Sequence, residues 1–257
     1  MIFIENAKVL QQKQLSPDFF RLDLAAPQIA AAGLAGQFVM VKTAPGYDPY
    51  LKRPFGISSF AGAGISLVYR LVGRGTKLMS ELRSGDYLEL TGPLGQPWQI
   101  KGVKKSLLVG GGTGIAPLVA LAQVLKQQGA EIYICLGAND GPGLICREEL
   151  AACGKVYLVT MDGSMGAKGL VTLILPGEID FDGVYACGPK PMLAAVAAWA
   201  EKRDLPCQVS LEAHMGCGLG TCMGCVCPVK SRDGQAIYQR ICREGPVFPA
   251  GEVIFHD

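Results

Sequence analysis

The hydrophobic pattern of the chain changes near Lys105, and this change constrains the fold more than any other feature. Residues 1–100 contain short β-rich runs, among them GQFVMVKT, ISLVYRLV and DYLELTGP, which glycine, proline and aspartate turns separate. Only 75–82 has helical spacing, with Leu78 and Leu82 at positions i and i+4. Many short strands with little helix predict a small antiparallel barrel or sandwich.

From Lys105 onward, apolar strands alternate with helical patterns. The runs KSLLVG, EIYICLG, VYLVTMDG and GVYACGP have strand character, and helical segments are predicted from Leu118 and near 147–153 and 190–203. This alternation predicts a parallel α/β sheet. The last segment, from about Pro206, loses the alternation and is rich in cysteine and glycine. We therefore predict three regions, 1–100, 101–205 and 206–257.

The bulk properties indicate a well-buried protein. The chain has 257 residues, 49% of them hydrophobic and 18% charged, which fits two domains with a small appendage. The net charge of +2 without a basic run gives no reason to expect a nucleic acid partner. No apolar run approaches about eighteen residues, so no membrane span is expected. The start, MIFIENAKVL, has no secretory pattern, and we expect a cytoplasmic protein.

A glycine-rich turn in VGGGTGIAPL follows a predicted strand and opens a predicted helix. Free backbone N–H groups and the helix dipole favour a phosphate there, although the same pattern also suits a tight turn with no ligand. The turn CGPKPML ends a later strand, and in a parallel sheet both turns would reach one dinucleotide. No Arg or Lys precedes Arg147 after the second strand, which favours NAD over NADP. The candidate residues are Gly111, Gly112, Thr113, Gly114, Cys187, Gly188 and Pro189.

The stretch LKRPFGISS (51–59) is interpreted as the end of one strand and the start of another. Arg53 could pair with a phosphate and Phe55 could lie against a flat ring, while Arg70 and Gly75-Thr76 form a second possible anion site. Considered singly, both arginines fit an exposed surface charge better than an anion site.

These stretches, with the glycine turn and the CGP turn, resemble the ferredoxin–NADP reductase superfamily, which pairs a flavin-binding barrel with a nicotinamide-nucleotide α/β domain. The resemblance implies FAD contacts at Arg53, Pro54, Phe55, Gly56, Arg70, Leu71, Val72, Gly75 and Thr76. Gly56 departs from the usual serine of the flavin motif, so a hydroxyl at that position is missing.

Ten cysteines are present, and five of them fall between 217 and 242. The spacing Cys217-x4-Cys222-x2-Cys225 matches the start of a plant-type [2Fe–2S] pattern, whereas zinc sites usually show two separated C-x2-C pairs. The fourth ligand is Cys227 or Cys242. Cys227 lies only two positions after Cys225, whereas Cys242 would return across a hairpin around Asp233-Gly234. We predict Cys242, with Cys227 as a buried bystander.

The runs QVSLEAHMGCGLGTCMGCVCPV and ICREGPVF resemble the electron-transfer subunits of class 1B dihydroorotate dehydrogenases. That resemblance implies the ligands Cys217, Cys222, Cys225 and Cys242, the cofactors FAD, [2Fe–2S] and NAD, and a heterotetramer with an FMN-containing catalytic subunit in pyrimidine biosynthesis. Dihydroorotate would bind the partner. No catalytic residue is therefore predicted here, and His214 and His256 are interpreted as structural or surface residues.

Two other functions stay open at this stage. The chain could be the NAD(P)H-linked flavin and iron–sulfur reductase subunit of a hydrogenase, sulfide-linked or oxygenase complex. It could also be a nonenzymatic nucleotide-binding module with a structural zinc ion.

Overall fold

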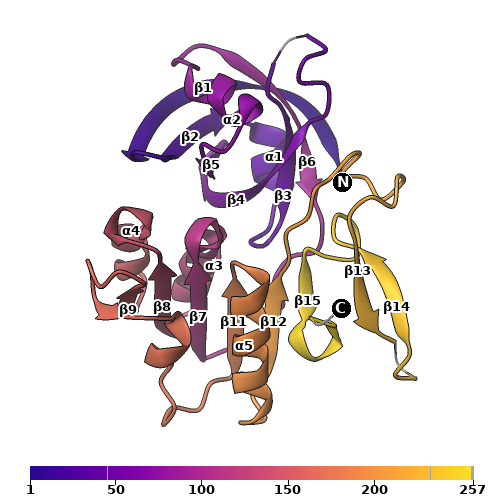
Figure 1. Cartoon of the computed structure of the whole chain (residues 1–257). Coiled ribbons are helices and arrows are strands. Elements are labelled where there is room, and N and C mark those ends of the chain that lie inside the picture. Colours follow the sequence, from indigo (N-terminus) through magenta and orange to yellow (C-terminus); the bar gives the residue numbers. More distant parts are fainter. Residues whose placement is uncertain (45, 232, 256–257) are drawn as a thin grey trace.

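The N-terminal part of the protein is a closed six-stranded barrel (Figure 1), in a computed structural model that describes residues 1–44, 46–231 and 233–255. Its strands are β1 (Phe3–Ser16), β2 (Phe19–Ala25), β3 (Phe38–Lys42), β4 (Arg53–Ala61), β5 (Gly64–Arg70) and β6 (Tyr87–Leu94), with helices α1 (Pro27–Ala32) and α2 (Arg74–Ser80). Every pair of neighbouring strands is antiparallel. Alternate residues such as Leu22, Leu24, Leu67 and Leu90 fill the interior, as period-two strands require. The predicted antiparallel barrel is confirmed.

One detail of the barrel differs from the prediction. Residues 51–59 do not end one strand and begin another, because β4 runs unbroken from Arg53 to Ala61. Pro54 lies opposite Met40 and Gly56 lies opposite Phe38, so both strand-breaking residues are held in register by β3. The pairing with β3 overrides the local signal of proline and glycine.

The second part is a seven-stranded sheet in the order β10-β9-β8-β7-β11-β12-β15, parallel except for the edge strand β15. The strands are β7 (Lys105–Gly111), β8 (Glu131–Ala138), β9 (Lys155–Thr160), β10 (Ala167–Lys168), β11 (Gly183–Cys187), β12 (Cys207–Ser210) and β15 (Val247–Pro249). The helices are α3 (Pro117–Gln127), α4 (Arg147–Ala151) and α5 (Lys190–Glu201), with the short helices η1 (Gly112–Ile115), η2 (Gly141–Gly143), η3 (Val171–Ile174) and η4 (Ala250–Glu252). The predicted parallel sheet and its three helices are confirmed.

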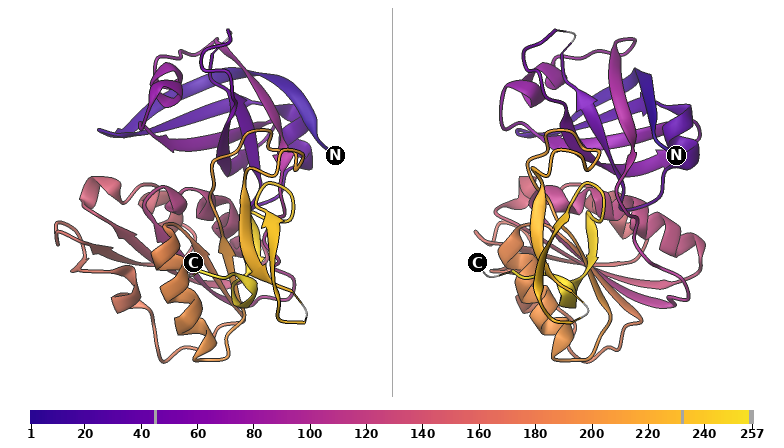
Figure 2. Two further views of the ribbon diagram at one scale, coloured as in Figure 1. Left: turned by 45° about the vertical axis from the view of Figure 1, so that its right-hand side comes forward. Right: turned by 90° about the vertical axis from the view of Figure 1, so that its right-hand side faces the viewer.

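The two sheet faces bury different cores. Leu118, Leu121 and Leu125 of α3 pack with Leu108 and Ile134 on one face, whereas α5 covers the opposite face. In two views the barrel lies over the end of the sheet where α3 begins (Figure 2). In a parallel sheet with helices on both faces, ligands bind outside the carboxyl ends of the strands.

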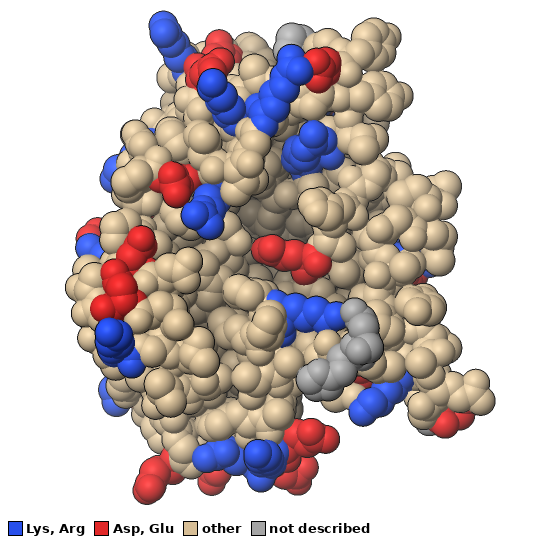
Figure 3. Space-filling view, in the orientation of Figure 1, with Lys and Arg blue, Asp and Glu red and all other residues tan. Residues whose placement is uncertain are grey.

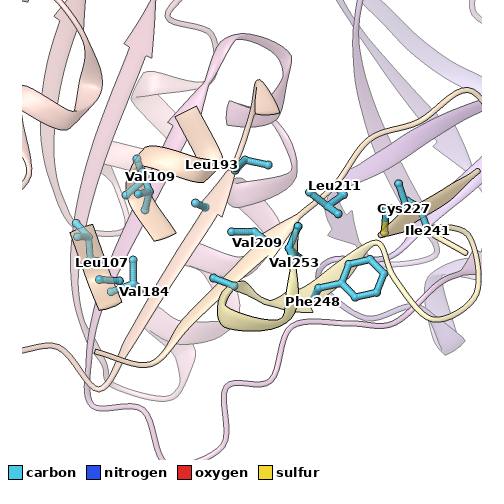
Figure 4. Packing of buried hydrophobic residues seen from close by; sticks show 14 of the residues in the cluster. Leu107, Val109, Val184, Leu193, Val209, Leu211, Cys227, Ile241, Phe248 and Val253 are labelled. Carbon is cyan, nitrogen blue, oxygen red and sulfur yellow. The ribbon is translucent and has the colours of Figure 1, made fainter. Parts of the chain in front are cut away.

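The cysteine-rich segment forms the predicted hairpin, β13 (Val226–Lys230) paired antiparallel with β14 (Ala236–Arg240). The hairpin has no separate core, because Cys227 and Ile241 pack in one cluster with Leu211 and Val209 of the α/β sheet (Figure 4). The strands β12 and β15, on either side of this segment in the sequence, both belong to the sheet. The limits 100/101 and 205/206 stay a prediction.

Candidate functional site

A cavity of about 770 Å³ opens at the carboxyl ends of the parallel strands. Gly111, Gly112 and Thr113 of the glycine turn and Gly188 and Pro189 of the CGP turn all line it. The two turns are therefore brought together, as expected for a dinucleotide spanning the ends of β7 and β11. The space-filling view shows this face hollowed between the barrel and the sheet (Figure 3).

Gly114 does not line this cavity, and its contacts explain why it is a glycine. An added Cβ would lie 2.4 Å from the carbonyl carbon and oxygen of Cys187. Only a residue without a side chain lets η1 approach the end of β11 this closely. Gly114 thus fixes the distance between the two turns.

The smaller cavity, about 340 Å³, lies between the barrel and the sheet. Six residues predicted for a flavin line it, namely Pro54, Phe55, Gly56, Arg70, Val72 and Thr76. The other three, Arg53, Leu71 and Gly75, do not line the cavity. Arg53 nevertheless lies beside the first turn of α2, because a Cβ at Gly75 would be 3.6 Å from its Cγ and Nε atoms. Cys187, predicted for the dinucleotide, lines this smaller cavity instead.

The structure gives a packing reason for Gly56. A Cβ at this position would lie 2.9 Å from Cγ of Pro117, the first residue of α3. Ser58, two residues along β4, is buried and donates a hydrogen bond of 3.0 Å to the carbonyl of Ala116. Ser58 does not line the flavin-sized cavity, so its hydroxyl does not replace the missing serine there.

The two cavities adjoin, because Arg70, Thr113 and Glu212 line both of them. Glu212 lines this shared space and is exposed to it. Protein atoms nevertheless surround its carboxyl group, and this burial raises the pKa of that group. Burial also raises the pKa of the Cys187 thiol, and the nearby charge of Glu212 adds to that effect. The thiol is therefore neutral near pH 7.

The cysteines of the C-terminal segment are grouped in two pairs. Beside the effect of burial, the Cys222 side chain lowers the pKa of Cys217, and the Cys225 side chain raises the pKa of Cys242. Burial alone would raise the pKa of Cys217, but backbone N–H groups, among them that of Leu219 at 3.3 Å from its sulfur, lower the pKa to about 6. The backbone N–H of Cys242 donates to the Cys225 sulfur at 3.4 Å.

The pairing of these cysteines is compatible with a binuclear cluster. In the described part of the chain, no group of three or more His, Cys, Asp or Glu side chains is placed to hold a metal ion. Each iron of a [2Fe–2S] cluster takes two thiolates, which matches two pairs. Gly216 and Gly224 leave room around the Cys222 sulfur, which an added Cβ would approach to 3.4 and 3.5 Å.

Cys227 is 8% exposed and lies in the hydrophobic cluster that the hairpin shares with the sheet (Figure 4), as do Cys225 and Cys242, which are each 3% exposed. Burial raises the pKa of its thiol to about 11, with a contribution from Cys225. Burial therefore does not separate Cys227 from the predicted ligands, and the choice of Cys242 over Cys227 stays a prediction, which the hydrogen bond from Cys242 to the Cys225 sulfur favours.

Sequence reasoning missed Glu212 and Met215, which both line the smaller cavity. Glu212 lies two residues after the end of β12, directly after Leu211. Its place after a parallel strand was the available signal, but β12 has only four residues and is hard to recognise in the sequence. Of the two histidines, His214 is exposed and His256 lies outside the described residues. No helix within the described ranges is long and apolar enough to cross a bilayer.

Two family models match the chain. Residues 212–254 match the iron–sulfur cluster binding domain of dihydroorotate dehydrogenase B, and residues 108–198 match an oxidoreductase NAD-binding domain. A protein of Caldanaerobacter subterraneus subsp. tengcongensis, named dihydroorotate dehydrogenase B (NAD(+)), electron transfer subunit, is 44% identical over 223 residues, 86% of this chain and 87% of that protein. One of the same name from Bacillus caldolyticus is 37% identical over 99% of this chain and 100% of its own length. The chain belongs to this family of electron transfer subunits.

Solved structures agree with this assignment. A chain of the NADH-dependent reduced ferredoxin–NADP oxidoreductase has a TM-score of 0.87 and 29% identity, and the match covers 98% of this chain and 90% of that one. The ferredoxin reductase of carbazole 1,9a-dioxygenase shares the fold, with a TM-score of 0.68, 21% identity, and coverage of 80% and 67%. The chain is an oxidoreductase component, and its cofactors are a [2Fe–2S] cluster, FAD and NAD.

Proposed function

We propose that this chain carries electrons from the FMN of a dihydroorotate-oxidising catalytic subunit through the [2Fe–2S] cluster and FAD to NAD+, in pyrimidine biosynthesis. When bound, FAD supplies the exchange between the single electrons of a cluster and the hydride of NAD. The residues of this chain would hold FAD and NAD in the two adjoining cavities and the cluster at the cysteine pairs. The names of its relatives support the proposal.

One observation carries the proposal, namely the continuity between the smaller cavity and the cysteine pairs. Leu211, Glu212, Ala213 and Met215 all line that cavity, and Cys217 follows only two residues later. The same loop therefore forms the wall of the flavin-sized cavity and begins the cluster-binding segment. A single loop shared by both sites favours a short path between two redox groups.

We assign each predicted residue a binding role. The flavin phosphates would be held by Arg53, Gly75 and Thr76. The flavin ring would face Pro54 and Phe55, and its cavity would be completed by Gly56, Arg70, Leu71 and Val72. The dinucleotide would be held by Gly111, Gly112, Thr113, Gly188 and Pro189, with Gly114 setting the approach of the two turns and Cys187 facing the flavin cavity. One iron would be held by Cys217 and Cys222, and the other by Cys225 and Cys242.

The partner would approach the cysteine pairs from solvent. Cys222 is exposed, and the neighbouring side chains of Leu219 and Met223 are 47% and 52% exposed. Apolar residues around an exposed redox site suit a protein interface. We propose a heterotetramer with the catalytic subunit, located in the cytoplasm, where thiols stay reduced for cluster assembly.

Anaerobic purification from the native host tests the proposal. The expected result is flavin absorption together with a [2Fe–2S] spectrum, and co-purification of an FMN protein that oxidises dihydroorotate. A coloured protein with a different redox partner would instead support the reductase of another complex. A colourless protein containing zinc but no iron would contradict both.

A further inference from the structure

Glu212 occupies the one place where the dinucleotide cavity and the flavin cavity meet. Only three residues line both cavities, and Glu212 is the only acidic one among them. Hydride transfer requires the nicotinamide ring and the flavin to touch, at roughly 3–3.5 Å between reacting atoms. The nicotinamide end of the dinucleotide must therefore lie at this junction, within reach of Glu212.

Among the residues that the structure describes, none supplies a counter-charge to the carboxylate of Glu212. Within the described residues it forms no hydrogen bond and no ion pair, and no cation contributes to its pKa. Arg70 is the cation at the same junction. Its Nη2 atom lies 3.4 Å from Oδ2 of Asp18, and its guanidinium group lies over the ring of Phe19, so its charge is paired with these two residues and not with Glu212. A crowded carboxylate without a partner is costly unless a ligand supplies the opposite charge.

We propose that Glu212 is a specificity-determining residue for the oxidation state of the nicotinamide, acting as the counter-ion of the cationic ring of NAD+. The ring of NAD+ carries a positive charge, whereas the reduced ring is neutral. A carboxylate at the junction attracts the first and has no such interaction with the second. Glu212 thereby favours binding of NAD+ and release of NADH, the order needed for electron flow toward NAD+. This inference rests on the proposed function of the two cavities.

A second carboxylate in the same cavity provides a matched control. Asp140 lines the dinucleotide cavity after the end of β8, and Glu212 lies after the end of β12. Two strands, β7 and β11, separate β8 from β12, so these strand ends are about 14 Å apart. Asp140 therefore lies away from the flavin cavity, which it does not line. Removing its charge changes the same cavity without changing the nicotinamide end.

The test compares binding of NAD+ with binding of 1,4,5,6-tetrahydro-NAD, whose ring is neutral and cannot release a hydride. Dissociation constants are measured by calorimetry on the full chain with its cofactors. Glu212→Gln should raise the ratio of the NAD+ constant to the tetrahydro-NAD constant about tenfold. Asp140→Asn should change both constants by the same factor and leave the ratio unchanged. Glu212→Asp, which keeps the charge, should keep most of the preference.

Flavin and iron content verify that each variant is intact, and Glu212→Ala, which also removes the charge, replaces Glu212→Gln in the comparison with wild type if the latter loses FAD. An unchanged ratio in Glu212→Gln would overturn the proposal, and so would an equal rise in Asp140→Asn. Equal weakening of both ligands by Glu212→Gln would assign the residue a positioning role and also overturn it. These measurements need no catalytic subunit, so their failure is distinct from failure of the proposed electron path.

Discussion

Replacing Gly114 by alanine should separate the two turns that form the dinucleotide cavity. The added Cβ would lie 2.4 Å from backbone atoms of Cys187, roughly 1 Å inside the usual contact distance of about 3.5 Å. Backbone cannot rotate away as a side chain can, so we expect the upper range of overpacking costs, about 3 kcal/mol. For a protein of this size, that corresponds to a fall in Tm of about 6–12 °C.

Thermal unfolding followed by circular dichroism measures this change, and NAD+ calorimetry measures the cavity. Gly251→Ala is the matched control, because nothing lies within 4 Å of its added Cβ and its φ is ordinary. Gly114→Ala should unfold at lower temperature than this control and bind NAD+ at least about tenfold more weakly. A Tm within about 1 °C of the control, with unchanged NAD+ affinity, would refute the reasoning from close packing.

Three further predictions concern the cysteine pairs, the flavin cavity and Glu212. Cys242→Ser should abolish or greatly alter the [2Fe–2S] spectrum while Cys227→Ser leaves it nearly intact, and the reverse result in iron analysis would exchange their roles. Arg53→Gln should reduce flavin content more than iron content, and equal losses of both would remove its assigned role. Burial raises the pKa of Glu212 above its ordinary 4.5, so the folded state binds the proton of this carboxyl group more tightly than the unfolded state does. The stabilisation that comes from this proton is complete below about pH 4.5 and is lost as the pH rises through the folded pKa. Glu212→Gln should therefore gain Tm relative to wild type between about pH 5 and about pH 8, and a constant difference across this range would contradict the burial argument.

Much of the fold could be predicted because its signals are local. The change from strands to alternating strands and helices near Lys105 predicts the barrel and the parallel sheet, which depend on hydrophobic period alone. The Asp233-Gly234 turn predicts the hairpin for the same reason. In contrast, β4 was predicted as two pieces, because its continuity depends on pairing with β3, a contact that the sequence does not reveal.

The candidate site depended more on tertiary contacts. The glycine turn and the CGP turn have recognisable local patterns, and both line the dinucleotide cavity. Glu212 lies within the run QVSLEAHMGC, but its significance arises only where the two cavities meet, which the sequence does not show. The sequence shows Gly56 as a departure from the family pattern. The structure explains the glycine by the ring of Pro117, which begins α3 far along the chain and leaves no room for a Cβ at position 56.

The central claim is that electrons reach NAD+ through the cysteine pairs of this chain. The most direct measurement is anaerobic, dihydroorotate-dependent NADH formation by the chain reconstituted with its catalytic subunit, compared with the same complex carrying Cys242→Ser. The account predicts rapid NADH formation by the wild-type complex and almost none by the variant, while NADH still reduces the FAD of the variant directly. NADH formation at the wild-type rate in the Cys242→Ser complex would contradict the account.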